Sequence, residues 1–512
     1  MQDFTPSGAN KNLIQKQRVI CLKKTALPLL ALLLVLFFLF ASPSLADDGS
    51  SVGLDTLEEI YMQVQNLHIY NPDPETLIRG AIEGLIGSLD DPYTEYLPPE
   101  EIKNFSDSLD GDYVGVGIQL QPGGEYPRVI STFENTPASE AGIKPDDLVI
   151  KVDGVSVLNE PLGTVVQKIR GPKGTKVRLT IRRQGVADFE VELVRASINT
   201  PTVSGKMLEP GIGYIRISMF GTHTPEEFGK TLAGLIRQGA DGLILDLRDN
   251  PGGILQAAVQ VGGNFLETGR VVVSTVDRNG RRQEYCNEEK PVARGIPVVV
   301  LVNHNSASAA EILAGALQDY GAAVLIGSQT YGKGTVQIVV PLETGGALKL
   351  TAARYWTPNG RIIDGTGLSP DIQVLTSDLH LAAAKRYLKK QTGGELVFKK
   401  DKPEALINGE AVQLRQAVLE RSGLVYLPLR FLFEGLGYRV DWQADNDGIK
   451  ISGAGAEVIF YAGQGRAVAG GQVVPGAAPL LFEEGAAFIP LNNLGIFNIG
   501  VVVEGNNIIL KK

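Results

Sequence analysis

The chain has few of the residues that hold small domains together covalently. Among its 512 residues there are only two cysteines, and Cys21 lies in the N-terminal leader, so Cys286 is alone in the rest of the chain. A framework of disulfides is therefore excluded. Glycine and proline are frequent, at 60 and 28 residues, yet no long low-complexity tract occurs. The chain must fold by packing apolar cores, and it is long enough for three or four domains.

Long apolar runs are also scarce, and the one that stands out spans residues 26–41. Basic residues precede it at Lys11, Lys16, Arg18, Lys23 and Lys24. The run is shorter than the roughly 20 residues that a membrane-spanning helix needs. Ser44-Leu45-Ala46 then supplies small residues at the spacing of a cleavage site. We expect residues 1–46 to be a cleaved secretory signal, with a retained membrane anchor as the alternative. Either way the protein is expected to be extracytoplasmic, secreted or in the cell envelope.

The chain that remains after such a cleavage is acidic. Residues 1–46 hold five basic and one acidic residue, so 43 basic and 56 acidic residues remain, for a net charge of −13. An acidic exported protein is a poor candidate for binding nucleic acid or an anionic lipid surface.

Residues 47–111 are predicted to be a helical N-terminal segment, with helices over 54–65 and 74–88. In the second helix apolar residues recur at spacings of three and four, as in Leu77, Ala81 and Leu85. Asp90-Asp91-Pro92 then ends it. Nothing in this segment indicates chemistry. It is predicted to be a helical cap or a surface for self-association, which would make the protein a homodimer.

From residue 112 to 196 the pattern changes to short strands separated by glycine turns. A strand over 113–119 is predicted to pair with one over 128–133. A helix over 139–143, a strand over 147–152, a helix over 162–169 and a strand over 176–182 are predicted to follow. With the phrases Pro137-Ala138-Ser139-Glu140-Ala141-Gly142 and Asp146-Asp147-Leu148-Val149, this order resembles a PDZ domain.

PDZ domains bind a peptide by adding it as a strand, while backbone amides hold the terminal carboxylate. The resemblance places this function at Tyr113, Val114, Gly115 and Val116, where the glycine lets the backbone approach a ligand. The alternative is that the glycine only permits a tight entry into the strand. The expected ligands are the C-termini of proteins or peptides.

Residues 197–393 are predicted to form an α/β core. Apolar strands are expected at 213–218, 242–247, 297–302, 323–327 and 336–340, and helices at 225–237, 308–320 and 382–391. Strands that alternate with helices indicate a sheet covered by helices. The predicted fold class is a multidomain α/β protein with a helical N-terminal segment, a PDZ domain, an α/β core and a small β-rich C-terminal domain.

Residues 394–402 are predicted to be a polar linker, and residues 403–512 a separate β-rich module in which segment 425–429 recurs as 487–491. Leu427-Pro428-Leu429-Arg430 and Leu436-Gly437-Tyr438-Arg439-Val440-Asp441-Trp442 resemble the module named after the N-terminal domain of copper amine oxidases. The histidines of the chain, His68, His223, His304 and His380, all lie outside it. We therefore expect no copper site, and we predict that the module docks a component of the cell envelope.

Two short runs carry the candidate chemistry. In the first, Ser308-Ala309-Ala310-Glu311 has the spacing of a capping box, so one interpretation makes Ser308 only a helix N-cap. The same helix start offers free backbone amides, and the N–H of Ala309 could face a developing oxyanion. A second donor could come from the turn that contains Gly252 and Gly253, although a plain turn is the alternative there. The sequence does not decide which glycine would donate.

The second run places Lys333 between Gly332 and Gly334, next to apolar strands. A lysine with an ordinary pKa, about 10.4, is protonated, but burial can lower this pKa by several units. The neutral amine could then accept the proton of Ser308. Gln337 lies on the same face of an extended strand but about 13 Å away, at about 3.3 Å per residue. It reaches Lys333 only if Gly334 bends the chain.

Two other interpretations of these runs are weaker. The spacing from Gly327 to Lys333 is that of a phosphate loop, but Gly334 stands where a magnesium-binding Ser or Thr is required. His304 precedes Ser308 by four residues, but a packed or surface histidine is the simpler explanation. No cofactor and no metal site are predicted.

Several motifs agree in order and spacing with the carboxy-terminal processing, or tail-specific, serine peptidase family, which the chain resembles over residues 54–384. They are Ser88-Leu89-Asp90-Asp91-Pro92-Tyr93-Thr94, Leu245-Asp246-Leu247-Arg248-Asp249-Asn250-Pro251-Gly252-Gly253, Ser306-Ala307-Ser308-Ala309-Ala310-Glu311-Ile312-Leu313, Gln318-Asp319 and Tyr331-Gly332-Lys333-Gly334-Thr335-Val336-Gln337. The resemblance implies that Ser308 is the nucleophile, Lys333 the general base and Gln337 the residue that orients the lysine. It also implies oxyanion donors at Ala309 and in the Gly252-Gly253 turn. Asp319 matches a position that is acidic and important in some members, and we expect it to be structural first.

The sequence thus predicts an exported serine endopeptidase that recognises C-terminal tails through its PDZ domain and cleaves peptide bonds with a Ser/Lys dyad. The family resemblance suggests that the PDZ domain also acts as a gate. Arg170 is the residue that we expect to report the position of the PDZ domain to the core, with a solvated loop charge as the alternative. The competing function is an exported PDZ scaffold that binds protein C-termini without catalysis. The joint presence of Ser308, Lys333 and Gln337 favours the enzyme, because a scaffold would not need them.

Overall fold

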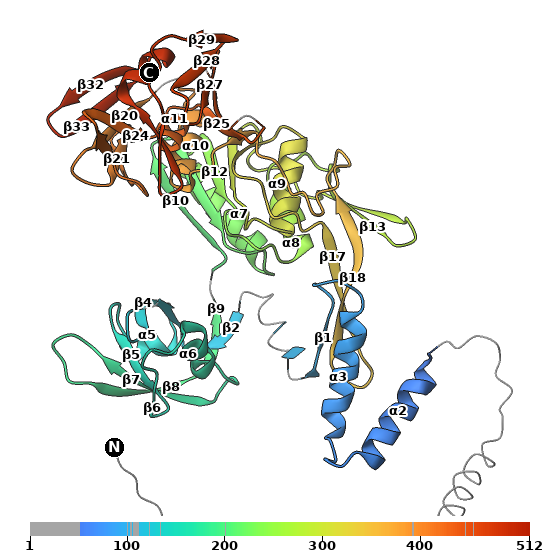
Figure 1. Cartoon of the computed structure of the whole chain (residues 1–512). Helices are drawn as coiled ribbons and strands as arrows, with labels where there is room; N and C mark the ends of the chain where they lie inside the picture. The colour runs from blue at the N-terminus through green and yellow to red at the C-terminus, as the bar shows by residue number, and fades with distance from the viewer. Residues whose placement is uncertain are drawn as a thin grey trace, which may run out of the picture. The chain divides into compact units, whose positions relative to one another are not determined.

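The structure is a computed structural model that describes residues 52–99, 101–102, 105, 112–121, 123–133, 135–199, 201–391, 394–445, 447–453 and 455–512. The predicted leader, residues 1–46, lies outside the described residues. Among those described, no helix is both long and apolar enough to cross a membrane. The chain divides into two units, Met1–Ile82 and Glu83–Lys512. Figure 1 shows the helices and strands of the described residues.

The N-terminal helices form as their periodicity predicts. Helix α2 is Leu54–Leu67 and helix α3 is Pro74–Gly87. Asp73 caps α3, since its Oδ2 accepts the N–H of Thr76 at 2.8 Å, and proline suits the first helical position because an N–H there has no partner. Neither helix buries a residue, and Ile60 and Met62 are more than half exposed. Self-association through these helices stays a prediction.

The elements expected of a PDZ domain lie between residues 112 and 199. They are β2 (Asp112–Gly115), β3 (Ile118–Gln121), β4 (Arg128–Thr132), α5 (Pro137–Glu140), β5 (Leu148–Val152), β6 (Val155–Ser156), α6 (Leu162–Ile169), β7 (Lys176–Arg182), β8 (Phe189–Val194) and β9 (Ala196–Asn199). One sheet runs in the order β3-β4-β5-β7-β8, with β6 paired to β5, and β2 pairs separately with β9. Val149, Val165 and Leu179 are fully buried in its core.

The prediction of one continuous strand over 113–119 is wrong. Gly117 has a φ of +81°, which a strand does not use, so the run breaks into β2 and β3. A Cβ on Gly117 would lie 2.3 Å from Thr136, so the position requires glycine. Only β3 pairs with β4, as predicted for the second half of the run.

The α/β core contains a six-stranded sheet in the order β10-β11-β12-β15-β16-β19. Its elements are β10 (Val203–Glu209), β11 (Ile212–Ile217), α7 (Thr224–Arg237), β12 (Gly242–Asp246), α8 (Leu255–Gly262), β15 (Val298–Val302), α9 (Ala309–Asp319), β16 (Val324–Gly327), β19 (Ile372–Gln373) and α10 (His380–Leu388). The strands from β11 to β19 are parallel, and β10 is antiparallel to β11. The predicted alternation of strands and helices is confirmed.

A second sheet of the core supports the turn that carries Lys333. It contains β1 (Glu95–Leu97), β13 (Val271–Asp277), β14 (Arg282–Cys286), β17 (Thr335–Pro341) and β18 (Ala347–Trp356). The order is β1-β18-β13-β14, and β17 forms a hairpin with β18. Ile338, Val339 and Val340 on β17 are each at least 39% exposed, so this hairpin is less covered than the first sheet.

The two faces of the first sheet are buried by different parts of the chain. Leu243 and Leu245 of β12 belong to one apolar cluster with α7, α8 and α9, whereas Ile244 between them belongs to another. The second cluster includes residues of α10 and continues into the C-terminal module, where Leu396 and Phe398 are fully buried. The module therefore shares a core with the α/β sheet and is not a separate unit.

The prediction of a polar linker over 394–402 is also wrong, because this segment belongs to the core that the module shares with the α/β sheet. Strand β20 (Glu395–Lys399) lies there, paired with β21 (Glu404–Ile407) and β33 (Asn507–Lys511). Its apolar centre, including Leu396, is buried although lysines follow it. The two similar segments of the module pair with each other, since β24 (Leu424–Pro428) is antiparallel to β31 (Ala486–Pro490).

The remaining elements of the module form short hairpins and two helices. They are β22 (Glu410–Gln413), β23 (Leu419–Arg421), α11 (Leu429–Gly435), β25 (Arg439–Gln443), β26 (Gly448–Gly453), β27 (Ala456–Tyr461), β28 (Arg466–Ala469), β29 (Gln472–Val474), β30 (Leu481–Glu483), the 3-10 helix η2 (Leu491–Phe497) and β32 (Gly500–Glu504). Glu434 of α11 is buried and accepts the N–H groups of Leu375 and Thr376 at 3.1 and 2.9 Å. This side chain ties the module to the loop before α10.

Candidate active site

Ser308 lies directly before α9 in an unusual backbone conformation. Its φ is +54° and its ψ is −117°, a combination that residues other than glycine avoid. The surrounding structure must therefore hold the backbone of Ser308 in this conformation. An ordinary N-cap residue is extended. A strained serine at a strand-to-helix turn is the arrangement that exposes the nucleophile in other hydrolases. The backbone of Ser308 is thus more strained than the role of a helix cap requires.

Glu311 joins the two motif runs. Its side chain is fully buried in the first turn of α9. Oε2 accepts the N–H of Ser308 at 2.8 Å and that of Lys333 at 3.0 Å. Oε1 accepts the N–H of Gly332 at 2.8 Å and the hydroxyl of Thr330. Burial raises the pKa of this carboxyl, and the four donors oppose the rise. The two runs therefore meet in the fold at a single carboxylate.

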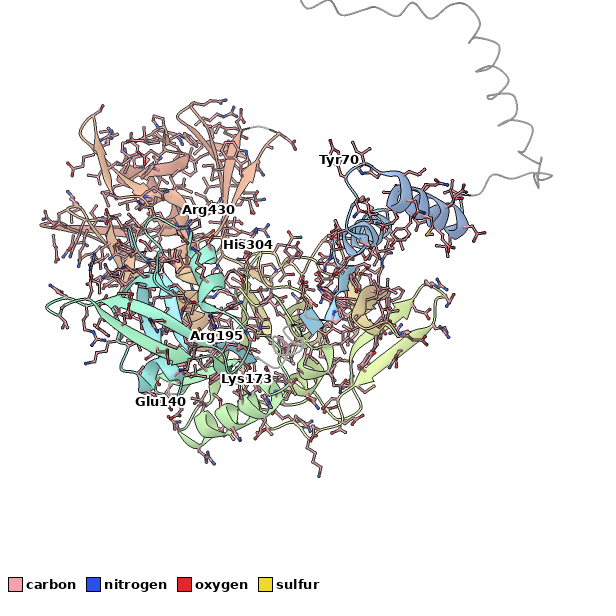
Figure 2. The ribbon with its side chains drawn as sticks, turned by 90° about the horizontal axis from the view of Figure 1, so that it is seen from below. Tyr70, Glu140, Lys173, Arg195, His304 and Arg430 are labelled. Atoms are coloured by element: carbon pink, nitrogen blue, oxygen red, sulfur yellow. The ribbon has the colours of Figure 1, made fainter. Side chains whose placement is uncertain are left out.

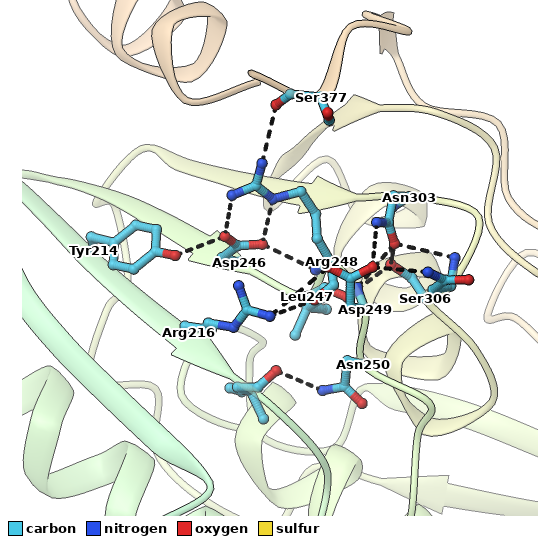
Figure 3. Close-up of polar contacts among 12 residues, drawn as sticks. Tyr214, Arg216, Asp246, Leu247, Arg248, Asp249, Asn250, Asn303, Ser306 and Ser377 are labelled. Carbon is cyan, nitrogen blue, oxygen red and sulfur yellow. Dashed lines mark hydrogen bonds and ion pairs between the residues drawn. The ribbon is translucent and has the colours of Figure 1, made fainter. Parts of the chain in front are cut away.

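A buried ion pair fixes the loop after β12. Arg248 donates from Nη2 to Oδ2 of Asp246 at 2.6 Å and from Nε to Oδ1 at 2.9 Å (Figure 3). The hydroxyl of Tyr214 also donates to Asp246, at 2.7 Å, and burial together with this bond raises the pKa of Tyr214 to about 12. Burial opposes the charge of Asp246, but the bonds to Arg248 hold its pKa below the ordinary value. The loop therefore starts from a rigid charged anchor.

Further hydrogen bonds attach this loop to the run around Ser308. Ser306 donates its hydroxyl to the carbonyl of Leu247 at 2.8 Å (Figure 3). The carbonyl of Asn250 accepts the N–H of Ala307 at 2.9 Å. The side-chain oxygen of Asn250 accepts the N–H of Gly252 at 2.8 Å. Loop and helix start are thus one connected unit.

Gly252 lies against the start of α9, and Gly253 lies against the backbone of Phe220. A Cβ on Gly252 would lie 2.7 Å from Cβ of Ser308 and 2.9 Å from the nitrogen of Ala309, so only glycine fits. The N–H of Gly252 is already bound to Asn250. Among the described residues, the N–H groups of Gly253 and Ala309 have no hydrogen-bond acceptor. These two are the amides that remain available to an oxyanion.

The amine of Lys333 contacts an aromatic ring. Its Nζ is 4.4 Å from the centre of the Tyr93 ring, and within the described part of the chain it makes no hydrogen bond to Ser308 or Gln337. Burial lowers the pKa of this amine, and the charge of Lys349 lowers it further, while Asp91 and Glu95 oppose them. The direction is the one that a general base requires.

The side-chain amide of Gln337 is hydrogen-bonded to residues other than the lysine. The pairing of β17 with β18 shifts between Val336 and Gln337, so the strand is not the regular one that the sequence suggests. The side-chain amide of Gln337 donates to the hydroxyls of Thr335 and Thr351 at 3.0 and 3.2 Å. The structure thus brings together Ser308, Ala309, the glycine turn and the backbone of Lys333, but not the two side chains that would activate the serine.

The environments of the other residues considered for catalysis do not indicate a chemical role. Asp319 lies 2.5 Å from Nη2 of Arg361 and accepts the N–H of Asn359 at 2.8 Å, which fits the structural role expected for it. His304, labelled in Figure 2, is exposed and makes no hydrogen bond to Ser308 among the described residues. The turn around Lys333 leads into β17 rather than into a helix, so it lacks the helix start that a phosphate loop needs.

The predicted peptide-binding residues occupy two different settings. Tyr113, Val114 and Gly115 belong to β2 and pair with β9, while the carbonyl of Val116 accepts the N–H of Ala138 at 2.9 Å. Strand β3 lies at the end of the PDZ sheet order, so one of its edges is unpaired within that sheet. An added strand would pair there. The predicted loop leads to this edge, which the prediction of one continuous strand over 113–119 does not identify.

Arg170 ends helix α6 and is exposed. A second arginine, which the sequence analysis did not single out, is the buried one. Arg195, labelled in Figure 2, donates from Nε to the carbonyl of Ile169 at 2.8 Å and from Nη1 to the carbonyl of Lys176 at 2.8 Å. Its charge thus lies at the C-terminus of α6, where the helix dipole favours a cation. Arg195 links this helix to the strands that lead back to the core.

Comparison with known families agrees with each part of this architecture. The family described as "Peptidase family S41" matches residues 211–374, and "PDZ domain" matches residues 133–183. "Activating protease CtpB N-terminal domain" matches residues 43–101, and "Copper amine oxidase N-terminal domain" matches residues 393–509.

Two curated relatives from Bacillus subtilis cover most of the chain. The carboxy-terminal processing protease CtpA is 36% identical over 70% of this chain and 78% of its own length. The carboxy-terminal processing protease CtpB is 35% identical over 67% of this chain and 72% of its own length. Among solved structures, the photosystem II D1 C-terminal processing protease is 30% identical, with a TM-score of 0.41, over 65% of this chain and 90% of that one. The chain belongs to the carboxy-terminal processing protease family of serine peptidases and carries a PDZ domain.

Proposed function

We propose that the protein cleaves peptide bonds with a Ser/Lys dyad, in which Ser308 is the nucleophile, Lys333 the general base and Gln337 the residue that orients the lysine. The observation that carries this proposal is the position of Glu311. Its carboxylate holds the backbone of Ser308 and the backbone of Lys333 at once. The amine of Lys333 is on a flexible stem, so it can turn towards the serine without moving that backbone.

The chemical steps follow from these groups. The neutral amine of Lys333 takes the proton of Ser308 as its oxygen attacks the peptide carbonyl. The N–H groups of Ala309 and Gly253 stabilise the oxyanion, while Gly252 provides the space for the substrate carbonyl. The protonated lysine then gives its proton to the leaving amine. Water finally attacks the acyl-enzyme, with Lys333 again accepting a proton.

Peptide substrates enter through their C-terminal tails. We propose that the loop Tyr113–Val116 holds the terminal carboxylate and that the tail pairs with the edge of β3. Arg170, at the end of α6, would report tail binding to the core. The family membership favours this peptidase over the PDZ scaffold, since a scaffold needs neither the strained Ser308 nor a lysine of lowered pKa.

The proposal is tested by cleavage of an unfolded protein that ends in an apolar tail, followed by mass spectrometry. The protein without residues 1–46 is compared with its Ser308→Ala and Lys333→Ala variants. We expect cleavage by the parent and by neither variant. Equal cleavage by all three would exclude the dyad, and tail binding without any cleavage would restore the scaffold.

We further propose that the protein is exported and works outside the cytoplasm, secreted or in the cell envelope, through the leader at residues 1–46. N-terminal sequencing of the protein from a membrane and a culture-medium fraction tests this. A start near Asp47 would indicate a cleaved signal, an intact N-terminus in the membrane fraction an anchor, and protein found only in the cytoplasm would exclude export. Sedimentation of the same protein would test the homodimer.

The C-terminal module is proposed to dock a cell-envelope component. A cavity of about 490 Å³ is lined by Trp442 and Phe482, which are 50% and 43% exposed, with Gln413 and Arg415 among the polar residues. Large exposed aromatic side chains around a cavity are typical of binding sites. Cosedimentation with purified cell-wall material tests the proposal. The Trp442→Ala variant should bind less while cleaving a soluble substrate as before.

A further inference from the structure

A side chain against the charge of Lys333 comes from a segment outside the two runs that carry Ser308 and Lys333. Tyr93 lies just before β1, and the Nζ of Lys333 is 4.4 Å from the centre of its ring. Tyr93 is half-buried, and a hydrogen bond with Tyr331 is one cause of its raised pKa, after burial itself. The amine thus lies over the face of a ring that is held by its burial and by the hydrogen bond with Tyr331.

The segment that presents Tyr93 is itself held firmly. Asp91 accepts the N–H of Tyr93 at 3.0 Å through Oδ1 and the hydroxyl of Thr94 at 2.5 Å through Oδ2. The oxygen of Thr94 accepts the N–H of Thr351 on β18 at 3.1 Å. Thr351 in turn accepts the side-chain amide of Gln337 at 3.2 Å. One short network therefore holds the ring over the lysine and keeps Gln337 turned towards β18.

An aromatic face acts on a lysine in a definite direction. The ring attracts the protonated amine and gains little from the neutral one. A general base, in contrast, must be neutral and must reach the serine hydroxyl. The contact with Tyr93 therefore stabilises Lys333 in the wrong charge state, in an arrangement without a hydrogen bond to Ser308.

We propose that Tyr93 is a positioning residue that holds Lys333 in a disengaged, protonated arrangement, and that this contact must break when the dyad forms. The inference rests on the proposed role of Lys333 as general base. It adds a residue from the N-terminal segment to the reaction, because Tyr93 competes with Ser308 for the same amine. Movement of the segment would release Lys333 and Gln337 together.

Other charges also act on this amine, and the test must separate them from the ring. Asp91 and Glu95 favour its protonated form and Lys349 disfavours it. Glu311 binds the backbone N–H of the same residue, and Asp364 binds that of Gly334. None of these groups is altered in the variants below.

The experiment measures the rate at which a fluorophosphonate probe labels the full-length chain, in mild detergent, as a function of pH. The Tyr93→Leu variant keeps an apolar side chain but removes the aromatic face. We expect its labelling to be about two- to thirty-fold faster than that of the parent, the range of a cation–π contact. The acid limb of the pH profile should move to lower pH, because the protonated lysine has lost a stabilising contact. A merely structural role of Tyr93 would lower the rate without moving this limb.

Two further variants keep the result decisive. The Tyr93→Phe variant retains a ring but loses the hydroxyl, so its labelling rate should increase less than that of the leucine variant. If the leucine variant does not fold, the phenylalanine variant tests the proposal in its place. The Tyr96→Leu variant makes the same substitution on β1 and should give no increase. A folded Tyr93→Leu protein with an unchanged or slower rate would overturn the proposal, as would an equal increase for Tyr96→Leu. Labelling of Lys333→Ala at the parental rate would instead overturn the dyad itself.

Discussion

The two halves of the candidate site are held in different ways. The nucleophile half consists of Ser308, Ala309 and the Gly252-Gly253 turn, and buried hydrogen bonds and close backbone contacts fix each part. The base half, named after the proposed role of Lys333, consists of the side chain of Lys333 and that of Gln337 on β17. Both side chains contact partners other than Ser308.

For the proposed dyad, this difference indicates where activity would be controlled. A preorganised oxyanion site must be rigid, because its donors stabilise the transition state only if they need no rearrangement. A lysine base can be switched by a change of side-chain position, because the displaced amine is solvated or bound elsewhere at little cost. The base half is therefore the part whose assembly can depend on substrate.

Replacing Glu311 should have the largest effect, because it is the residue that both halves share. Glu311→Ala leaves the N–H groups of Ser308, Gly332 and Lys333 buried without an acceptor, which should lower the free energy of unfolding by about 3–5 kcal/mol. Cleavage should be lost as well. Denaturant unfolding and a peptide cleavage assay measure both effects. Glu457→Ala, at an exposed position, is the control, and an active Glu311→Ala enzyme would show that the halves assemble without this carboxylate.

Gly252→Ala should damage the nucleophile half alone. The new Cβ would lie 2.7 Å from Cβ of Ser308, at a φ of +103° that alanine avoids. We expect kcat/KM to fall by about 100-fold or more, since displaced reacting groups lose most of their rate advantage. Gly269→Ala is a matched control, because Gly269 has a φ of +84° and nothing within 4 Å of its added Cβ. It should cost about 1 kcal/mol of stability and leave kcat/KM unchanged.

Lys349→Met should alter the base half through charge only. Lys349 lowers the pKa of Lys333, so its removal should raise that pKa. In the proposed mechanism the neutral amine is the active form, so activity rises with pH through this pKa. The acid limb of the pH–rate profile should therefore move to higher pH. Activity at high pH should change little. Lys389→Met removes another lysine that pairs with a glutamate and should leave the profile in place. A shift to lower pH would contradict the assignment of this limb to Lys333.

Thr351→Val should give the smallest effect. The substitution removes the acceptor that holds the side-chain amide of Gln337 at 3.2 Å, a loss of about 1 kcal/mol or less. If Gln337 orients the lysine, its release should raise kcat about two-fold with little change in KM. Thr351→Ser keeps the hydroxyl and serves as the comparison. A lower kcat in the valine variant alone would mean that the present position of Gln337 is the productive one.

Much of the fold could be predicted from local patterns. The helices at 74–88 and 162–169 and the strand at 176–182 have periodicities or flanking turns that fix them within a few residues. Two predictions failed where tertiary contacts decide. Residues 394–402 resemble a linker because lysines follow a short apolar centre, but Leu396 and Phe398 fill a core shared with the α/β sheet. The predicted strand over 113–119 is broken at Gly117, whose backbone lies so close to Thr136 that only glycine fits there.

The sequence by itself determined the residue types of the site and their order. It placed a serine at a helix start, a lysine between glycines and a glycine turn after a buried strand, because each depends on neighbours within a few positions. Only the tertiary structure decided that Glu311 joins the serine and lysine runs, that Gly252 already donates its N–H to Asn250, and that Tyr93 rather than Ser308 lies against the amine of Lys333. These contacts join residues far apart in the chain, and side-chain direction and burial, which set them, exist only once the chain has folded.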